Sequence, residues 1–362
     1  MVRYFPLISL TFITAFASVA LFVPRLRRFA VRIGAVQEGG GRRVHSGVMP
    51  NIGGIAIFAG FLLALTVGSA VNPALIDTYR VELLAIILGA ALMTLVGFID
   101  DIWEMSAGVR LAAQTLAAGI LVVNGVKIDF ITNYFSLHGP AYLYFGGSFG
   151  REMVSVAVTM LWVIGFTNAF NFIDGLDGLS SGMATISSFS LLAVAIQFPD
   201  RGAAILLLVA LAGAALGFLR HNFSPATIIM GDSGAYLLGY TLAAVSVMGA
   251  LKVTAAVAVA APILILALPV LNITQVTLRR LSRGVSPASA ANDHLHDVLR
   301  RRSGSKQLAV VILWIAALGL GALGMMLSNT PPLLIYLTVI LTVVLIAIVC
   351  LLRLAELRAE AV

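Results

Sequence analysis

Long apolar runs recur along almost the whole chain and are separated by short polar segments. They lie at 4–24, 51–71, 82–99, 108–126, 153–171, 178–198, 202–219, 234–250, 253–277, 307–328 and 332–352. A helix of about 17–25 apolar residues can cross the hydrocarbon core of a bilayer. The pattern therefore predicts an all-α, polytopic membrane protein with about eleven transmembrane helices.

The polar segments are too short to hold a separate soluble domain, and no internal repeat is visible. The longest of them covers residues 278–306. We therefore expect residues 1–362 to form a single integral-membrane domain. The first run could be mistaken for a cleaved signal peptide, but its positive cluster, which begins at Arg25, follows the run instead of preceding it. A retained span fits this order better.

Composition supports a membrane protein. Hydrophobic residues make up 60% of the 362 residues and charged residues only 11%, whereas soluble domains carry about 25% charged residues. The net charge of +7 is explained by an excess of basic residues in cytoplasmic loops, so no nucleic-acid partner is expected. The single cysteine, Cys350, lies in the last apolar run and excludes a disulfide framework.

The distribution of lysine and arginine predicts the orientation. If the N-terminus is outside, most of the 23 basic residues fall in inner loops, as the positive-inside rule requires. Eleven spans then place the C-terminus in the cytoplasm. Four polar motifs from four loops share this inner face: Asp100-Asp101, the segment 168–177, Asp232 and His294/His296. Their common side indicates one cytoplasmic site.

The segment from Asn168 to Gly178 concentrates costly polar groups at the end of an apolar run. Asn168, Asn171, Asp174 and Asp177 follow one another at steps of three. On an α-helix such steps drift by about 60° each, so the four side chains can meet at one ligand only if the helix stops. Glycine permits that stop. We expect the two asparagines at the helix end and the two aspartates in an unwound turn that binds a cation and a phosphate.

Two further motifs carry acids. Asp100 and Asp101 end an apolar run, and adjacent helical side chains point about 100° apart, so one carboxylate can face a metal or phosphate while the other faces a cation or backbone N–H. Arg110 and Gln114 follow one turn apart. Asp232 stands in a short loop between glycines, where it either caps a helix or binds a metal. Acids without a cysteine or histidine cage favour Mg²⁺, or Mn²⁺, over zinc.

Two basic loops add histidines. His294 and His296 stand beside Arg300 in a loop rich in arginine, an arrangement suited to clamping a diphosphate. His45 follows Arg42 and Arg43 in the other basic loop. Positive-inside charge or contact with anionic lipids is a sufficient explanation for the arginines taken alone.

Taken together, these motifs resemble a known family. The segments GFIDD, NAFNFIDGLDGLSSG, NFSPATIIMGDSGAYLLG and SRGVSPASAANDHLHDVL follow one another in this order. The chain resembles the polyprenyl-phosphate N-acetylhexosamine-1-phosphate transferases (glycosyltransferase family 4), and is most similar to the bacterial branch that loads GlcNAc-1-phosphate onto undecaprenyl phosphate. It departs from the family pattern at Asp297, where histidine is usual, at Ala291 and Asn292, where an acid and a base usually stand, and at Thr227, where lysine is common.

The resemblance implies a Mg²⁺-dependent phosphotransferase. Its donor would be a UDP-sugar, its acceptor a polyprenyl phosphate, and its products UMP and the first lipid-linked intermediate of a cell-envelope glycan. It also implies a multi-pass protein of the inner (plasma) membrane with a cytoplasmic active site. Another UDP-N-acetylhexosamine or UDP-MurNAc-pentapeptide remains an alternative donor, and a membrane transporter is the alternative class. The oligomeric state stays open, a homodimer included.

Carried over residue by residue, the resemblance divides the candidate residues into three groups. The catalytic candidates are Asp100, Asp101, Asp174, Asp177 and His294. The substrate-binding candidates are Asn168, Asn171, Arg110, His45, His296 and Arg300. The metal-binding candidates are Asp232 and Asp174. Whether Asp100 or Asp101 acts as a base or only positions the acceptor is left open, because a phosphate monoester is already largely dianionic at neutral pH.

Overall fold

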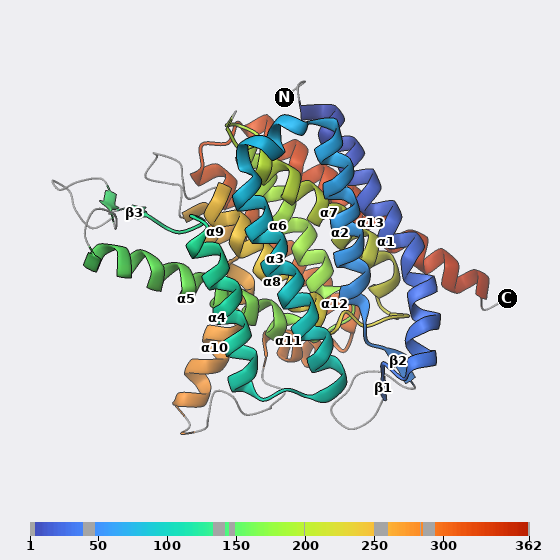
Figure 1. The fold of residues 1–362 in the computed structure, drawn as a ribbon. Helices are drawn as coiled ribbons and strands as arrows, with labels where there is room; N and C mark the ends of the chain where they lie inside the picture. Colours follow the sequence, from blue (N-terminus) through green and yellow to red (C-terminus); the bar gives the residue numbers. More distant parts are fainter. Residues whose placement is uncertain are drawn as a thin grey trace.

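The structure of the chain is a computed structural model. It describes residues 4–38, 48–132, 142–144, 149–198, 200–249, 260–282, 284 and 294–360. This part of the chain is mostly helical, and its long helices run side by side as a bundle (Figure 1). The helices are α1 (Phe5–Ile33), α2 (Gly53–Val71), α3 (Pro73–Trp103), α4 (Ala107–Val123), α5 (Phe149–Ile173), α6 (Leu179–Ala195), α7 (Gly202–Asn222), α8 (Gly231–Gly249), α9 (Ala260–Ile265), α10 (Ala267–Leu281), α11 (Leu295–Ser303), α12 (Lys306–Leu327) and α13 (Pro332–Glu360).

A helix lies at each position where the apolar runs predicted one, with one difference. The run at 253–277 is not one continuous helix in the described residues, because α9 ends at Ile265 and α10 begins at Ala267. Pro269 stands in the first turn of α10, and proline is tolerated at a helix start but interrupts a helix interior. Two prolines in this run, Pro262 and Pro269, were a visible signal for the break.

Seven of the described helices are long and apolar enough to cross a membrane: α1, α2, α3, α5, α7, α12 and α13. Helices α4 and α6 are apolar but shorter. The protein is thus a helical, multi-pass membrane protein by length and composition, while the number of eleven spans and the orientation of the termini remain predictions.

Helix α7 forms the centre of the bundle. Every residue in its most apolar window is buried, and α1, α2, α6 and α13 pack around it. A helix that is apolar around its whole circumference has no face for solvent, so it is stable only when other helices surround it. Helix α13, in contrast, is mostly exposed along its apolar length, as expected of a helix that faces lipid.

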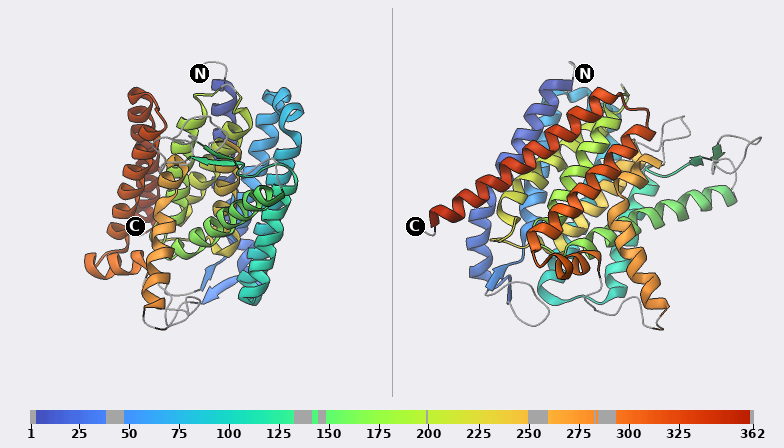
Figure 2. Two further views of the ribbon diagram at one scale, coloured as in Figure 1. Left: turned by 90° about the vertical axis from the view of Figure 1, so that its left-hand side faces the viewer. Right: turned by 180° about the vertical axis from the view of Figure 1, so that it is seen from behind.

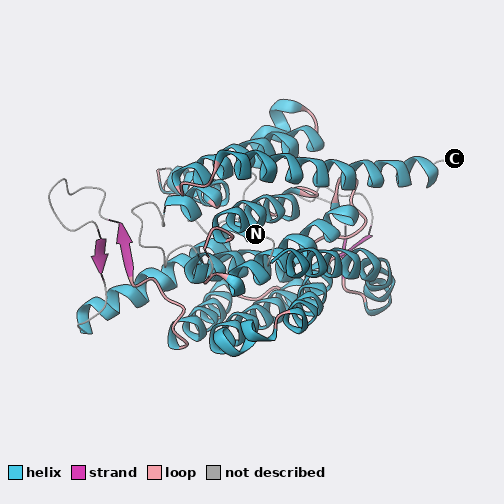
Figure 3. Cartoon of the chain, turned by 90° about the horizontal axis from the view of Figure 1, so that it is seen from above, coloured by secondary structure: helices cyan, strands magenta, loops and turns pink. Residues whose placement is uncertain are grey.

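Two short antiparallel hairpins accompany the helices, which the all-α prediction did not include. Strand β1 (Val36–Glu38) pairs with β2 (Val48–Pro50), and β3 (Phe130–Thr132) pairs with β4 (Tyr142–Tyr144). Seen from above, β3 and β4 lie outside the bundle (Figure 3). The first hairpin bears on the site, because the carbonyl oxygen of Pro50 accepts a hydrogen bond from Ile229 N, in the loop that leads into α8.

The polar motifs gather toward one end of the bundle. The end of α3, helix α11 and the first hairpin lie at the end opposite the N-terminus (Figure 1). This agrees with the expectation of one shared face for the motifs, although nothing in the fold tests which side of a membrane that face occupies.

Candidate active site

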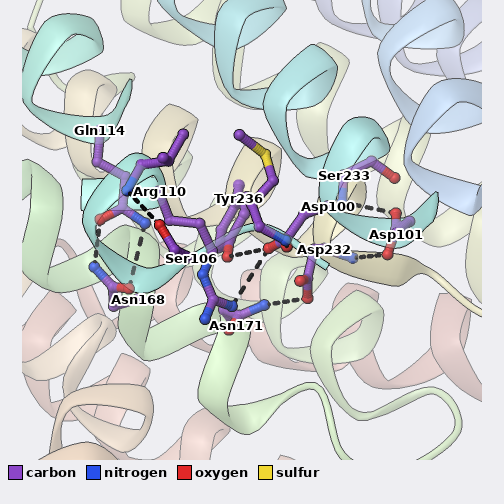
Figure 4. Close-up of polar contacts among 12 residues, drawn as sticks. Asp100, Asp101, Ser106, Arg110, Gln114, Asn168, Asn171, Asp232, Ser233 and Tyr236 are labelled. Carbon is purple, nitrogen blue, oxygen red and sulfur yellow. Dashed lines mark hydrogen bonds and ion pairs between the residues drawn. The ribbon is translucent and has the colours of Figure 1, made fainter. Parts of the chain in front are cut away.

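The two adjacent acids at the end of α3 serve different partners, as their angular separation predicted. Both oxygens of Asp101 accept hydrogen bonds from the start of α8, from Asp232 N at 2.8 Å and from Ser233 N at 3.2 Å. A carboxylate at a helix N-terminus satisfies free N–H groups and complements the helix dipole. Asp101 therefore holds the beginning of α8, and with it Asp232, against α3 (Figure 4).

This close approach depends on glycine at two positions. A Cβ atom on Gly97 of α3 would lie 2.4 Å from Ser233 N, so only glycine lets the backbones of α3 and α8 come this near. Gly231 has φ of 73°, a left-handed conformation that favours glycine, and starts α8. The glycines of the GFIDD and GDSG segments thus bring Asp101 and Asp232 together.

Asp100 lies in a buried cage of donors. Its Oδ2 atom is 3.3 Å from Arg110 Nη1 and accepts a hydrogen bond from Tyr236 Oη at 3.3 Å, while its Oδ1 atom accepts one from Met105 N at 2.6 Å. The Asp100 side chain is only 3% exposed, whereas that of Arg110 is 35% exposed. Arg110 is therefore the member of this pair that can also reach a ligand. Ser106 caps the N-terminus of α4 by accepting a hydrogen bond from Val109 N, and so fixes the first turn of α4, next to Arg110.

Helix α5 contributes two amides that contact α4 and α8. Asn168 and Gln114 exchange hydrogen bonds in both directions, at 2.6 and 3.3 Å. One turn later, Asn171 Nδ2 donates to Asp232 Oδ1 at 2.5 Å. The four residues that meet at the centre of Figure 4, Asp100, Asp101, Asn171 and Asp232, thus come from α3, α5 and α8.

The predicted helix stop is confirmed. Helix α5 ends at Ile173, and residues 174–178 form a turn before α6 begins. Gly178 has φ of 82° and donates its N–H to Asn222 Oδ1 at 2.9 Å. Asp177 Oδ2 accepts a hydrogen bond from Ala226 N at 3.3 Å. Asp177 therefore connects this turn to the loop between α7 and α8.

Asp174 lies in the same turn and is partly exposed. Loss of hydration raises the pKa of its carboxyl group to about 7, and the negative charges of Asp232 and Asp177 raise that pKa further as smaller contributions. Asp174 therefore lies near enough to Asp232 for the charges of the two carboxylates to interact.

The histidine motif packs on the turn that follows α5. The His294 ring stacks on Phe172, with 5.7 Å between centroids, and on His296, with 5.4 Å between centroids and 3° between the ring planes. Asn272 of α10 accepts a hydrogen bond from Leu295 N at 2.8 Å and so holds the start of α11. His296 is buried, and burial lowers the pKa of its ring to about 4. We therefore expect a neutral His296 at physiological pH.

Two other predicted binding residues are less directly tied to this cluster. Arg300 points toward Asp297, 3.6 Å away, within α11. His45, Ala291 and Asn292 lie outside the described residues. Asp297, which stands where the family usually has histidine, is also 3.7 Å from His296 Nε2. The acid therefore bridges the histidine and the arginine of this helix.

Sequence reasoning missed three residues that position the site: Asn51, Tyr236 and Asn272. Asn51 Nδ2 donates to Asp101 at 3.1 Å, Tyr236 donates to Asp100, and Asn272 holds the histidine motif. Tyr236 could have been found, because it lies one helical turn after Asp232 on a predicted helix. Asn51 and Asn272 gave no such local signal, since their partners are far away in sequence.

The donor set fits a hard divalent cation. Among the described residues, no three His, Cys, Asp or Glu side chains form a metal-binding group. Magnesium does not need one, because it typically takes one or two carboxylates and completes its shell with water and substrate phosphates. The Oδ1 atom of Asn51, in contact distance of this cluster, is buried and accepts no hydrogen bond from the described residues. The oxygen-only chemistry and this unused acceptor are compatible with Mg²⁺ or Mn²⁺.

We predict that Arg110→Gln lowers activity about 10- to 100-fold and also lowers the thermal unfolding temperature, because it leaves a buried carboxylate without its counter-charge. Arg110→Lys, which keeps the charge but loses the planar fork, should recover part of both losses. Turnover and thermal unfolding of the two variants in detergent check this. Equal loss in both variants would mean that charge is not what Arg110 provides.

A second prediction concerns Gly175. A Cβ atom there would lie 2.0 Å from His296 Nε2, so Gly175→Ala should displace the histidine motif and weaken binding of a diphosphate donor about tenfold. The control is Gly165→Ala in α5, the helix that leads into this turn, where nothing lies within 4 Å of the added atom. The apparent KM for donor distinguishes them. An unchanged KM in Gly175→Ala would separate the histidine motif from donor binding.

The fold and the cluster define an integral-membrane protein with an oxygen-rich polar site at one end of a helical bundle. Comparison with known proteins then shows which family the chain belongs to. A model of glycosyl transferase family 4 matches residues 83–250. This range contains most of α3, all of α4, α5 and α8, and all the side chains labelled in Figure 4.

Similar proteins agree over most of the chain. The chain is 32% identical over 315 residues to the probable undecaprenyl-phosphate N-acetylglucosaminyl 1-phosphate transferase of Bacillus subtilis. The matched region covers 85% of this chain and 81% of the Bacillus subtilis protein. The chain is 32% identical over 319 residues to the decaprenyl-phosphate N-acetylglucosaminephosphotransferase of Mycolicibacterium smegmatis, with coverage of 82% and 77%. It is 26% identical over 327 residues to the undecaprenyl-phosphate alpha-N-acetylglucosaminyl 1-phosphate transferase of Escherichia coli O157:H7, with coverage of 88% and 83%. The chain belongs to glycosyl transferase family 4.

Proposed function

We propose that this protein transfers GlcNAc-1-phosphate from UDP-GlcNAc to undecaprenyl phosphate and releases UMP. The observation that carries the proposal is the meeting of Asp100, Asp101 and Asp232 from α3 and α8 with Asn171 of α5 at one end of a membrane bundle. The names of the similar proteins from Bacillus subtilis and Mycolicibacterium smegmatis, which are polyprenyl-phosphate N-acetylglucosaminyl 1-phosphate transferases, support the same reaction.

The reaction we propose is a direct phosphoryl transfer. An oxygen of the acceptor phosphate attacks the sugar-bearing phosphorus of the donor. A P–O bond forms there while the bond to the bridging oxygen breaks, and that oxygen leaves with its electron pair as part of UMP. Such a reaction depends on positioning and on neutralising negative charge more than on covalent help from the protein. The dianionic acceptor needs no strong base.

The residues divide this work between them. We assign Arg110 to a substrate phosphate, because its guanidinium reaches from the buried Asp100 to the exposed side of the cluster. Asp101 positions Asp232 through the start of α8. We assign the donor diphosphate to His294 and His296, which stack on each other next to Phe172, near the end of α5.

We further propose Mg²⁺, or Mn²⁺, as the cofactor. We assign Asp232 and Asp174 to hold it, since the charges of the two carboxylates interact and Asp232 contacts the amide of Asn171. When bound, the cation supplies positive charge to the diphosphate. Asn171 keeps the carboxylate of Asp232 oriented by donating to one of its oxygens.

The proposed reaction also has an expected cellular location and an expected use for its product. We infer that the protein lies in the inner (plasma) membrane with this site on the cytoplasmic face, where UDP-sugars are made. Its product would start a lipid-linked glycan of the cell envelope. A transporter is disfavoured, because such proteins place ionisable groups near mid-membrane, whereas these acids lie at helix ends.

The test is an acceptor-dependent assay with the purified full-length protein in detergent. UDP-GlcNAc, UDP-GalNAc and UDP-MurNAc-pentapeptide are supplied in turn with undecaprenyl phosphate and Mg²⁺, and UMP is measured. We expect UMP from UDP-GlcNAc only when acceptor and Mg²⁺ are both present, and none after chelation by EDTA. Preference for another donor would change the proposed identity of the transferred sugar. Absence of UMP with every donor would reject the proposed reaction.

A further inference from the structure

A second charged cavity lies apart from the carboxylate cluster, between the ends of α1, α7 and α13. Its volume is about 480 Å³. The arginines that line it are Arg25, Arg27, Arg28, Arg220 and Arg353. In the right-hand view of Figure 2, α13 crosses the bundle diagonally toward α1. Arg25, Arg27 and Arg28 lie in the C-terminal half of α1. Helices far apart in sequence thus bring five guanidinium groups to one hollow.

The positive charge of this cavity is poorly balanced. Among the described residues that line it, Glu356 is the one carboxylate, and it contacts Arg220 at 2.5 Å and Arg353 at 3.7 Å. Because five arginines face one glutamate, four positive charges remain in excess. A hollow that keeps four uncompensated charges attracts an anion.

Two of these guanidinium groups have buried N–H donors without an acceptor among the described residues. The side chain of Arg353 is 4% exposed, and the Nε atoms of Arg220 and Arg353 are buried without a hydrogen-bond acceptor among the described residues. Buried donors are normally paired. Charge at the inner face of a membrane protein explains exposed arginines, but it does not explain buried N–H groups that point at no acceptor.

The position of the cavity favours a lipid over a soluble anion. It lies along the C-terminal half of α1 and at the end of α7, and both helices are candidate membrane spans. Ala20, Leu21 and Pro24 give it an apolar wall next to the arginines. An apolar wall beside clustered arginines at the end of membrane spans suits a phospholipid, whose phosphate meets the guanidinium groups while its chains stay in the bilayer.

We propose that this cavity binds the phosphate group of an anionic phospholipid, separately from the polyprenyl-phosphate acceptor. None of its lining residues belongs to the carboxylate cluster. One loop nevertheless connects the two places, because Thr227 lines the cavity while the neighbouring Ala226 donates to Asp177. Arg353 also donates to the carbonyl oxygen of Pro225 in this loop. The proposal does not depend on the proposed transfer reaction.

The test measures lipid binding to the purified full-length protein by native mass spectrometry. Phosphatidylglycerol and phosphatidylcholine are added at equal mole fractions, and we expect a selective phosphatidylglycerol adduct. The variant Arg27→Gln/Arg28→Gln should weaken this binding by roughly 25-fold, since each basic residue near an anionic lipid contributes about a fivefold factor. Neither arginine forms an ion pair with a described residue, so the protein should stay folded, which a thermal unfolding curve checks.

The matched control is Arg32→Gln/Arg358→Gln, which removes the same charge from α1 and α13 at exposed positions outside the cavity. It should bind within about twofold of the wild-type protein. Equal weakening in both variants would reduce the effect to surface charge and overturn the proposal. Displacement of phosphatidylglycerol by an equal concentration of glycerol phosphate would assign the cavity to soluble phosphates instead. Displacement by equimolar undecaprenyl phosphate would assign it to the acceptor, and either result also overturns the proposal.

Discussion

Asp232→Asn is expected to lower transfer about 1,000-fold, the size of effect seen when a group that stabilises developing charge is removed. The substitution keeps the size of the side chain and an oxygen that can accept the hydrogen bond from Asn171. It removes only the negative charge, which the proposed site uses for the cation. We therefore expect a folded protein whose thermal unfolding temperature stays near that of the wild type.

The control for this prediction is Asp200→Asn. Asp200 has a side chain that is 73% exposed and lies before α7, away from the cluster. It should retain wild-type turnover in the same UMP-release assay. Wild-type turnover in Asp232→Asn would contradict the assignment of Asp232, whereas an aggregated or unfolded Asp232→Asn protein would indicate a structural role instead.

Gly97→Ala is expected to lower activity about 100-fold, because a misplacement of roughly 1 Å between reacting groups costs about that much. The added Cβ atom would lie 2.4 Å from Ser233 N and 2.5 Å from the carbonyl carbon of Asp232. These are backbone atoms, so no side-chain rotation relieves the overlap. Helices α3 and α8 must separate, and Asp101 then loses its hydrogen bonds from Asp232 N and Ser233 N at the start of α8. A lower thermal unfolding temperature should accompany the loss.

Gly119→Ala in α4 provides the comparison. Nothing lies within 4 Å of the Cβ atom that this substitution adds. Alanine favours a helix over glycine by up to about 1 kcal/mol, so the unfolding temperature should stay the same or rise slightly and activity should not change. If Gly97→Ala behaved like Gly119→Ala, the close approach of α3 and α8 would not be what aligns the site.

The features that were predictable from sequence are those set by local periodicity. The stop of α5 before Asp174 followed from the three-residue spacing and Gly178, and the divergence of Asp100 and Asp101 followed from the 100° step along a helix. Both are found. The helical positions also followed from apolar run length, except where prolines divide residues 253–277 into α9 and α10.

The features that were not predictable depend on which helices become neighbours. The pairing of Gln114 with Asn168 joins α4 to α5, and that of Asn51 with Asp101 joins the residue after the first hairpin to α3. The stacking of His294 on Phe172 likewise requires α11 to fold back onto α5. Each contact spans many residues, and apolar runs of similar length carry no information about their order in the bundle. The hydrogen bond from Ala226 N to Asp177 likewise joins the turn after α5 to the loop before α8, and the catalytic role expected of Asp177 stays a prediction.

In the proposed reaction, the diphosphate bond of the donor breaks and the sugar moves to the lipid together with its phosphate. The most direct measurement uses UDP-GlcNAc radiolabelled at the β-phosphorus, with undecaprenyl phosphate and Mg²⁺, and follows where the label goes. We predict that the label enters the lipid fraction in equal amount to the unlabelled UMP released, and that Asp232→Asn prevents both. Label recovered as UDP, with sugar alone on the lipid, would contradict the account.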